Sequence, residues 1–170
     1  MNSEDTAVTA KDVIRQSLEG TRRVLTLLLN DLSDADLLVR PTSGANHIAW
    51  QLGHLIVSEH RMLSSLPGVT PPVLPEGFAE RHSAPAARLD PPQGFLRKSE
   101  YLELFDKVRA ASLDAVDRIP EADLDRPNTG PTAPIAPTLG ARFSLTSNHT
   151  MLHSGQFSVV RRALGKPNLL

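Results

Sequence analysis

Two histidines in the C-terminal part of the chain have the types and spacing that metal chemistry needs. His149 and His153 stand four residues apart, within residues 148–156. If this stretch is helical, about 3.6 residues per turn place both imidazoles on one face, one turn apart. Two neutral imidazoles at that spacing can chelate one divalent metal ion. The pair therefore predicts a metal site.

The residue after the first of these histidines argues against one class of metal enzyme. In the zinc-peptidase helix this residue is glutamate, the general base, whereas here it is Thr150. A peptidase of that class is not expected. The alternative for the pair is two core histidines that hydrogen-bond to backbone and water, because a buried imidazole needs partners for both ring nitrogens.

A third histidine favours the metal site over that alternative. His54 lies beside Leu55 in a second apolar stretch. Helical bundles build metal sites from side chains on facing helices. Three imidazoles leave coordination positions open for water or substrate, as a catalytic site needs. Zinc, nickel, iron and copper all accept such ligands.

The remaining histidines are expected to lie outside this site. His47 is seven residues before His54, about 10.5 Å along a helix, which is too far for the same ion and suggests a place near a helix start. His60 lies off the face of His54 and is expected to be solvated. His82 lies in a proline-rich loop that could reach the mouth of the site.

Glu59 is the candidate catalytic residue, because a carboxylate interrupts an apolar stripe and must find a partner there. It could accept a hydrogen bond from a ligating imidazole or transfer protons near the metal. The alternative is a buried ion pair with an arginine. The arginines considered are Arg22, Arg23 and Arg109.

Two further side chains are candidates for substrate binding. Trp50 could line an apolar pocket together with Phe78 and Phe95, although core packing explains a tryptophan there equally well. Gln156 follows His153 by about one turn, so it could orient a ligand or cap a neighbouring helix.

Four helices are expected to carry these residues. Twelve of the 14 prolines fall in residues 67–92 and 120–137, which predicts loops there because proline breaks helices. Four proline-free blocks remain, each with apolar residues at alternating spacings of four and three. The expected stripes are Ile14, Leu18, Thr21, Leu25, Leu28 and Leu32; Ile48, Leu52, Leu55, Glu59, Met62 and Leu66; Tyr101, Phe105, Val108, Ser112, Ala115 and Ile119; Leu139, Phe143, Thr146, Thr150, His153, Phe157, Val160 and Leu164.

The fold class that follows is all-α, a four-helix bundle formed by a single domain over residues 1–170. The loop of about 30 residues between the second and third helices is long for a compact domain. It is expected to be a crossover that returns the third helix parallel to the second, and it could also cover a site. The expected helix boundaries are a capping box at Thr9 and Asp12, N-caps at Asn46 or Ser43 and at Ser99, and a stop at Gly165 and Pro167.

Composition excludes several classes of site. The chain has no cysteine, so disulfides, iron–sulfur clusters and a thiol nucleophile of its own are absent. The net charge is −1 without a long basic run, so no nucleic-acid partner is expected. The polar, acidic residues 1–6 and the lack of a long apolar run predict no signal peptide and no membrane partner. The expected location is cytoplasmic.

Taken together, these residues resemble a known family. The features that carry the resemblance are Gly53-His54 with Glu59 following, His149-x-x-x-His153-Ser-Gly-Gln156, and Arg161-Arg162-Ala-Leu-Gly165-Lys-Pro167. They resemble the DinB-like (DinB/YfiT-type) family of four-helix bundles over essentially the whole chain. The resemblance implies a divalent metal held by three histidines, here His54, His149 and His153, and frequent homodimers.

The same resemblance suggests what such a protein does. Some members are S-transferases that use a low-molecular-weight thiol as cosubstrate, and others are described as metal-dependent hydrolases. The first hypothesis is therefore a metal-dependent enzyme in which a thiolate or hydroxide attacks a small electrophilic substrate. The alternative is a non-catalytic metal- or ligand-binding bundle of the stress response. A homodimer is also favoured by leucines outside the first core stripe, namely Leu27, Leu29, Leu37 and Leu38.

Overall fold

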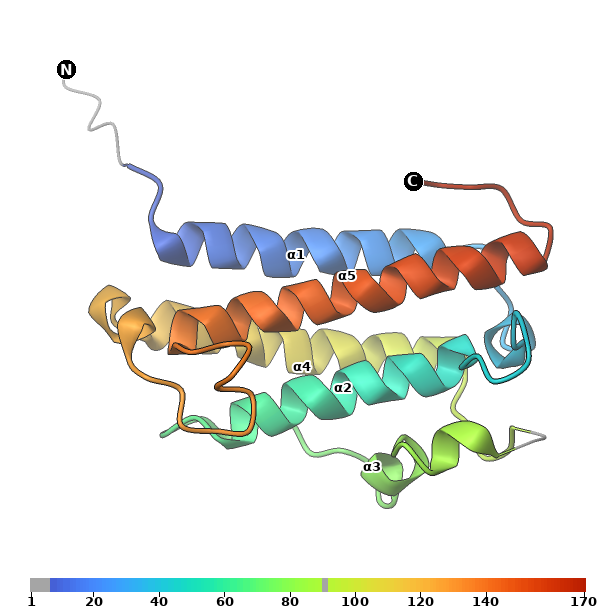
Figure 1. Cartoon of the computed structure of the whole chain (residues 1–170), viewed down its shortest axis with the longest axis horizontal. Helices are drawn as coiled ribbons and strands as arrows, with labels where there is room; N and C mark the ends of the chain where they lie inside the picture. The colour runs from blue at the N-terminus through green and yellow to red at the C-terminus, as the bar shows by residue number, and fades with distance from the viewer. Residues whose placement is uncertain (1–6, 90–91) are drawn as a thin grey trace.

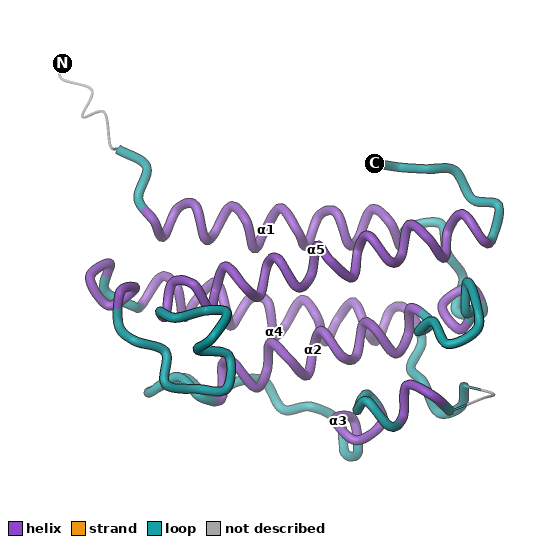
Figure 2. Tube along the Cα trace, viewed as in Figure 1, coloured by secondary structure: helices purple, strands orange, loops and turns teal. Residues whose placement is uncertain are grey.

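The proline-free blocks form four long helices in the computed structural model, which describes residues 7–89 and 92–170. The acidic start at residues 1–6 lies outside the described residues. The described part is helical, without a named strand (Figures 1 and 2). The helices are α1 (Ala10–Leu29), α2 (Ile48–Ser64), the short α3 (Phe78–Arg81), α4 (Lys98–Arg118) and α5 (Leu139–Ala163).

The expected stripes form the core of the bundle. Each of the four stripes is mostly buried, and its leucine, isoleucine and phenylalanine side chains meet in one apolar cluster. The capping box at Thr9 and Asp12 is present, and Gly165 ends the last helix with a left-handed φ of 69°. Two expected N-caps are wrong. His47, rather than Asn46 or Ser43, caps α2, and Arg97, rather than Ser99, precedes α4.

The four long helices run in two parallel pairs. The colours in Figure 1 show α1 and α5 running in one direction and α2 and α4 in the opposite direction. The helix α1 packs chiefly on α5, and α2 packs chiefly on α4. The crossover expected between the second and third long helices is therefore confirmed, and residues 65–97, which include α3, return along one side of the bundle.

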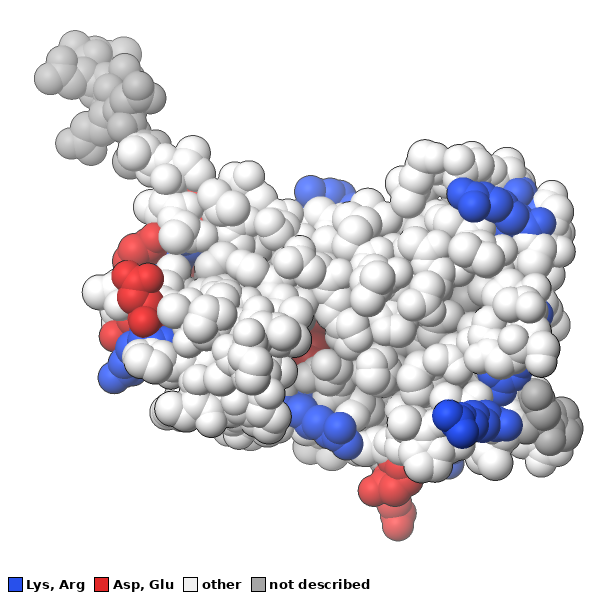
Figure 3. Space-filling model, in the orientation of Figure 1, with Lys and Arg blue, Asp and Glu red and all other residues white. Residues whose placement is uncertain are grey.

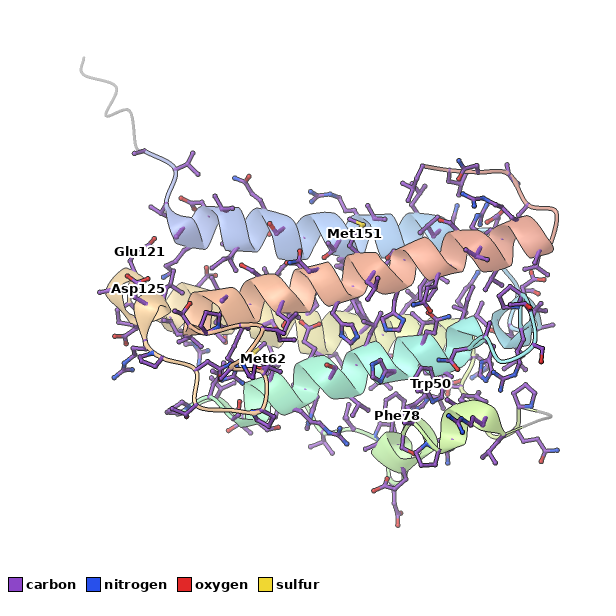
Figure 4. All side chains as sticks on the ribbon, in the orientation of Figure 1. Trp50, Met62, Phe78, Glu121, Asp125 and Met151 are labelled. Carbon is purple, nitrogen blue, oxygen red and sulfur yellow. The ribbon has the colours of Figure 1, made fainter. Side chains whose placement is uncertain are left out.

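Hydrogen bonds hold the crossover against α2 near Trp50. Trp50 donates a hydrogen bond from its indole Nε1 to the carbonyl oxygen of Ser83 at 3.0 Å. His82 is buried, and both of its ring nitrogens form hydrogen bonds. Nδ1 lies 2.7 Å from the carbonyl oxygen of Phe78, and Nε2 lies 2.7 Å from the hydroxyl oxygen of Tyr101. Figure 4 shows Trp50 and Phe78 in the space between α2 and α3.

Gly53 allows this close approach in the middle of α2. A Cβ atom at position 53 would lie 2.0 Å from Cδ2 of His82, which is far inside contact distance. The ring cannot move aside without losing both of its hydrogen bonds. A glycine that would weaken an isolated helix is therefore required here by the crossover.

We expect Gly53→Ala to destabilise the protein by about 1–3 kcal/mol through overpacking, although alanine favours helix by up to about 1 kcal/mol. Gly20→Ala is the matched control, because Gly20 also lies inside a helix and a Cβ atom there would meet only the end of the Arg23 side chain at an ordinary 3.8 Å. That variant is expected to gain about 0.5–1 kcal/mol. Chemical denaturation measures the free energy of unfolding of both variants. An equal increase in the two would contradict the close contact between Gly53 and His82.

The leucines that favoured a homodimer were expected on the surface, but two of them are buried. Leu29 and Leu37 are in the core, whereas Leu27 is 45 % exposed. The first block therefore offers less apolar surface than its sequence suggests. In the part of the chain that the structure describes, no helix is both long and apolar enough to cross a membrane.

Candidate metal centre

The histidine pair lies on α5 as the spacing predicts. The helix begins after Thr138, whose hydroxyl accepts a hydrogen bond from the backbone N–H of Ala141, and it continues without interruption through both histidines. His153 is 7 % exposed and His149 is half-buried. Their Nε2 atoms lie 3.1 Å apart. The Nε2 atoms of the two rings therefore lie close enough to bind the same metal ion.

His54 joins them from α2. Its ring centroid lies 5.1 Å from that of His149 and 5.3 Å from that of His153. One ring nitrogen from each of the three residues lies within 4.8 Å of the others. A tetrahedral ion at about 2.0–2.1 Å from each nitrogen needs separations of about 3.4 Å, so small side-chain shifts suffice. The structure brings together the three histidines that the sequence singled out.

The chemistry of the donor set fits a divalent metal ion. The group consists of three imidazoles without a carboxylate or a cysteine, and two of its nitrogens already face each other. In the absence of metal, one of those two nitrogens must carry the proton of their hydrogen bond. An ion that accepts both lone pairs would replace that proton, so these residues could hold a metal.

Side chains on α2 support two of the three rings. The indole of Trp50 stacks on His54, with ring centroids 4.9 Å apart and an angle of 11° between the planes. The side-chain oxygen of Gln51 lies 2.8 Å from Nδ1 of His153. Sequence reasoning missed Gln51. Its signal was a polar residue among buried apolar ones, three positions before His54 and hence about one turn away.

Burial keeps the three imidazoles neutral. Desolvation, with smaller effects of neighbouring histidines, lowers the pKa of His153 to about 3 and the pKa of His149 to about 4. The pKa of His54 is also lowered, first by burial and then by the charge of Arg61. A neutral imidazole is the form that binds a metal, so these rings have free lone pairs at neutral pH.

Metal release on acidification is therefore expected well below the ordinary histidine pKa of about 6.5. Protons compete with the metal only when the pH reaches the pKa of a metal-free ligand or falls below it, so occupancy should persist near pH 6 and be lost at about pH 4, the pKa of His149, or lower. Metal content after dialysis at stepped pH measures this. Half-release at about pH 6.5 with the bundle still folded would contradict the buried site.

Circular dichroism at each step is the control for this measurement. The unfolded chain takes up protons at a pKa of about 6.5, whereas the folded state keeps these histidines neutral to lower pH. Their contribution to stability is therefore complete above about pH 6.5 and is lost as the pH falls toward the folded values. A loss of helicity that accompanies metal release would indicate unfolding rather than direct competition by protons.

Glu59 lies in a buried ion pair, which was one of its two interpretations. Its Oε1 and Oε2 atoms accept hydrogen bonds from Nε and Nη2 of Arg109, both at 2.9 Å, and Ser112 donates to Oε1 at 2.7 Å. The same arginine donates to Thr150 at 2.9 Å. Thr150, which stands where a zinc peptidase has its glutamate, therefore faces the ion pair. A catalytic role for Glu59 remains a prediction.

The two residues considered for substrate binding lie in different surroundings. Trp50 is 6 % exposed, and it faces His54 and the crossover. Gln156 is exposed and lines a hollow of about 360 Å³ with Gln51, Val159 and residues of the loop before α2. A small molecule in this hollow would contact Gln156 directly, whereas Trp50 offers it little surface. Phe78 and Phe95 pack on His82 rather than on the three histidines.

The other histidines lie outside the cluster. His47 accepts a hydrogen bond from the backbone of Trp50 at the start of α2, as expected from its position. His60 is partly exposed and contacts Ser64. The ring of His82 lies against Gly53, which precedes His54, and it is not part of the cluster of three ligand nitrogens. Both of its nitrogens are used by Phe78 and Tyr101, and burial lowers its pKa to about 4.

Comparison with protein-family models gives the family. A model of the DinB superfamily matches residues 17–157, which include all three histidines. The chain belongs to the DinB superfamily. The resemblance drawn from the residues is thus confirmed, and so is the four-helix bundle of this superfamily. Among curated proteins, none matches the sequence.

Solved structures show a similar fold at low sequence identity. A conserved protein from Enterococcus faecalis superimposes with a TM-score of 0.70 and 18 % identity, covering 94 % of this chain and 100 % of that protein. YfiT from Bacillus subtilis, described as a probable metal-dependent hydrolase with an unusual four-helix bundle topology, gives 0.67 and 19 %, covering 98 % of this chain and 94 % of YfiT. At such identities the likeness concerns the fold alone.

Proposed function

We propose that this protein is a metal-dependent enzyme that holds a divalent ion with His54, His149 and His153 and acts on a small molecule. The observation that carries the proposal is the meeting of three neutral imidazoles from two helices, with ligand nitrogens within 4.8 Å of one another. Membership of the DinB superfamily and the description of YfiT as a probable metal-dependent hydrolase support it.

The chemistry proposed is S-transfer with a low-molecular-weight thiol, or hydrolysis. When bound, a zinc, nickel or iron ion would act as a Lewis acid that acidifies a thiol or water and polarises an electrophile. A thiol nucleophile must come from a cosubstrate, because the chain has no cysteine. Both reactions need the same three ligands and an open coordination position.

The surrounding residues would hold the ligands and admit the substrate. Trp50 backs the ring of His54, so this imidazole can move little toward the crossover. His54 and His149 are half-buried, which leaves their outer edges reachable from solvent. We place substrate binding near these edges and the adjoining hollow at Gln156.

Metal analysis followed by activity screening tests the proposal. Protein purified without chelators is expected to contain about one divalent ion per chain, measured by mass spectrometry of the elements. The loaded protein is then assayed with electrophiles in the presence and absence of small thiols, and with esters and amides. Full metal content without turnover in any assay would favour the metal-binding bundle of the stress response instead. A protein that takes up no metal would contradict the metal-dependent enzyme and leave only a ligand-binding bundle.

We also propose a homodimer that forms through the exposed side of α5. Residues 143–160 of this helix include no lysine, arginine, aspartate or glutamate. Figure 3 shows an uncharged surface over the middle of α5, and Met151 lies on this side of the molecule (Figure 4). Leu152 and Val159 are also exposed there. Apolar surface of this kind usually marks an interface.

Light scattering is expected to give twice the 18.5 kDa mass of one chain at micromolar concentration. Leu152→Arg should shift the protein toward the monomer, because a buried unpaired charge opposes association and Leu152 does not line the hollow at Gln156. Val73→Arg is the matched control, since Val73 is exposed on the crossover, away from α5. A wild-type monomer would end the dimer proposal without affecting the metal site.

A further inference from the structure

The side chain of Gln51 connects the backbone before α2 to one of the three histidines. It is 1 % exposed, so both ends of its amide need partners inside the protein. Its Nε2 donates a hydrogen bond to the carbonyl oxygen of Asn46 at 2.9 Å. A carbonyl oxygen can only accept, so the amide nitrogen must face Asn46 and the amide oxygen must face His153.

This orientation determines which nitrogen of His153 carries the proton. The Oε1 atom of Gln51 is an acceptor and lies 2.8 Å from Nδ1 of His153, so Nδ1 must donate. A neutral imidazole has one N–H, which leaves the lone pair on Nε2. That atom lies 3.1 Å from Nε2 of His149, and it therefore accepts a hydrogen bond from the Nε2–H group of His149 when no metal is bound.

We infer that Gln51 is a positioning residue that holds His153 in the tautomer with a proton on Nδ1 and aims its Nε2 lone pair at Nε2 of His149. This inference rests on the proposed function, because it assigns Gln51 a role in binding the metal through His153. The hydrogen bond to Asn46 in turn prevents the amide of Gln51 from rotating. Acceptors behind ligating histidines typically change metal affinity by about 10–100-fold when removed.

Nitrogen NMR of the imidazoles in the metal-free protein tests the tautomer directly. In the wild type, the spectrum is expected to show a protonated Nδ1 and an unprotonated Nε2 at His153. Gln51→Leu removes the acceptor and should abolish this preference, whereas Gln51→Glu keeps an acceptor and should retain it. A wild-type His153 protonated on Nε2 would overturn the inference without any need for a variant.

Affinity for Zn²⁺, measured by competition with a chelator at neutral pH, is the second readout. Gln51→Leu is expected to bind Zn²⁺ about 10–100-fold more weakly than the wild type. Gln51→Glu keeps the acceptor for Nδ1 of His153 but loses the hydrogen bond to Asn46, so it is expected to bind Zn²⁺ more tightly than Gln51→Leu. Gln156→Leu is the matched control for affinity, since Gln156 lines the same hollow and makes no hydrogen bond to His153. Circular dichroism checks that each variant is folded.

The two readouts separate this inference from the proposed function. Wild-type affinity and tautomer in Gln51→Leu would overturn the role of Gln51 and leave the metal site standing. A wild type that binds no Zn²⁺ would overturn the proposed function, and the NMR result would still decide the tautomer. If Gln51→Leu does not fold, the wild-type spectrum and Gln51→Glu carry the test.

Discussion

Replacing His153 by alanine is expected to weaken metal binding by more than about 100-fold, because even residues that only support a ligand change affinity by about 10–100-fold. His153 provides one of only three nitrogens in the cluster, and its loss leaves two ligands on different helices. Any metal-dependent turnover should disappear with the metal. Chelator competition and activity assays on the purified variant measure both effects.

The same variant should remain folded. Alanine leaves a small cavity and removes the hydrogen-bond partner of Gln51, which together should cost about 1–3 kcal/mol out of a typical stability of about 5–15 kcal/mol. His60→Ala is the matched control, because His60 is partly exposed and lies outside the cluster. Undiminished metal binding in His153→Ala would contradict the proposed site, whereas loss in both variants would indicate nonspecific binding.

Breaking the buried ion pair is expected to have the largest effect on stability. Arg109→Met should lower the free energy of unfolding by about 3–5 kcal/mol, because it leaves the carboxylate of Glu59 buried without its counter-charge. The exposed fractions of the two side chains are 1 % for Arg109 and 2 % for Glu59. Urea denaturation measures the change. A decrease in the free energy of unfolding of less than about 1 kcal/mol, as for exposed ion pairs, would contradict this prediction.

A double variant separates the pair from its surroundings. Glu59→Gln with Arg109→Met removes both charges, and it should be less destabilised than the sum of the single changes because no unpaired ion remains. Arg22→Met is the matched control. Arg22 also pairs with an aspartate, Asp106, but both side chains are about two-fifths exposed, so a change within about 1 kcal/mol is expected.

Glu59→Gln also tests the catalytic interpretation of this residue. The carboxylate is fully engaged by Arg109 and Ser112, so we expect stability to fall while metal content and activity per folded molecule stay unchanged. A variant that keeps its metal but loses about 100-fold or more in activity would instead assign Glu59 to proton transfer. The comparison requires that activity be normalised to folded protein.

Much of the architecture follows from local features of the sequence. Helical periodicity depends on neighbours three and four positions apart, so the four stripes, the capping box at Thr9 and the stop at Gly165 could be predicted from the chain alone. The spacing of His149 and His153 belongs to the same class, because a single helix determines it. The meeting of these two with His54 could be expected because bundles place facing helices about 8–10 Å apart.

The tertiary structure alone decided which side chains stand behind these ligands. The partner of Glu59, the contact of Gly53 with His82 and the hydrogen bond from His153 to Gln51 each join residues at least 29 positions apart. Such contacts depend on how helices are rotated and shifted against one another, which the packing of the whole core determines. The burial of Leu29 and Leu37 has the same origin, since periodicity predicts the face of a helix but not how widely neighbouring segments cover it.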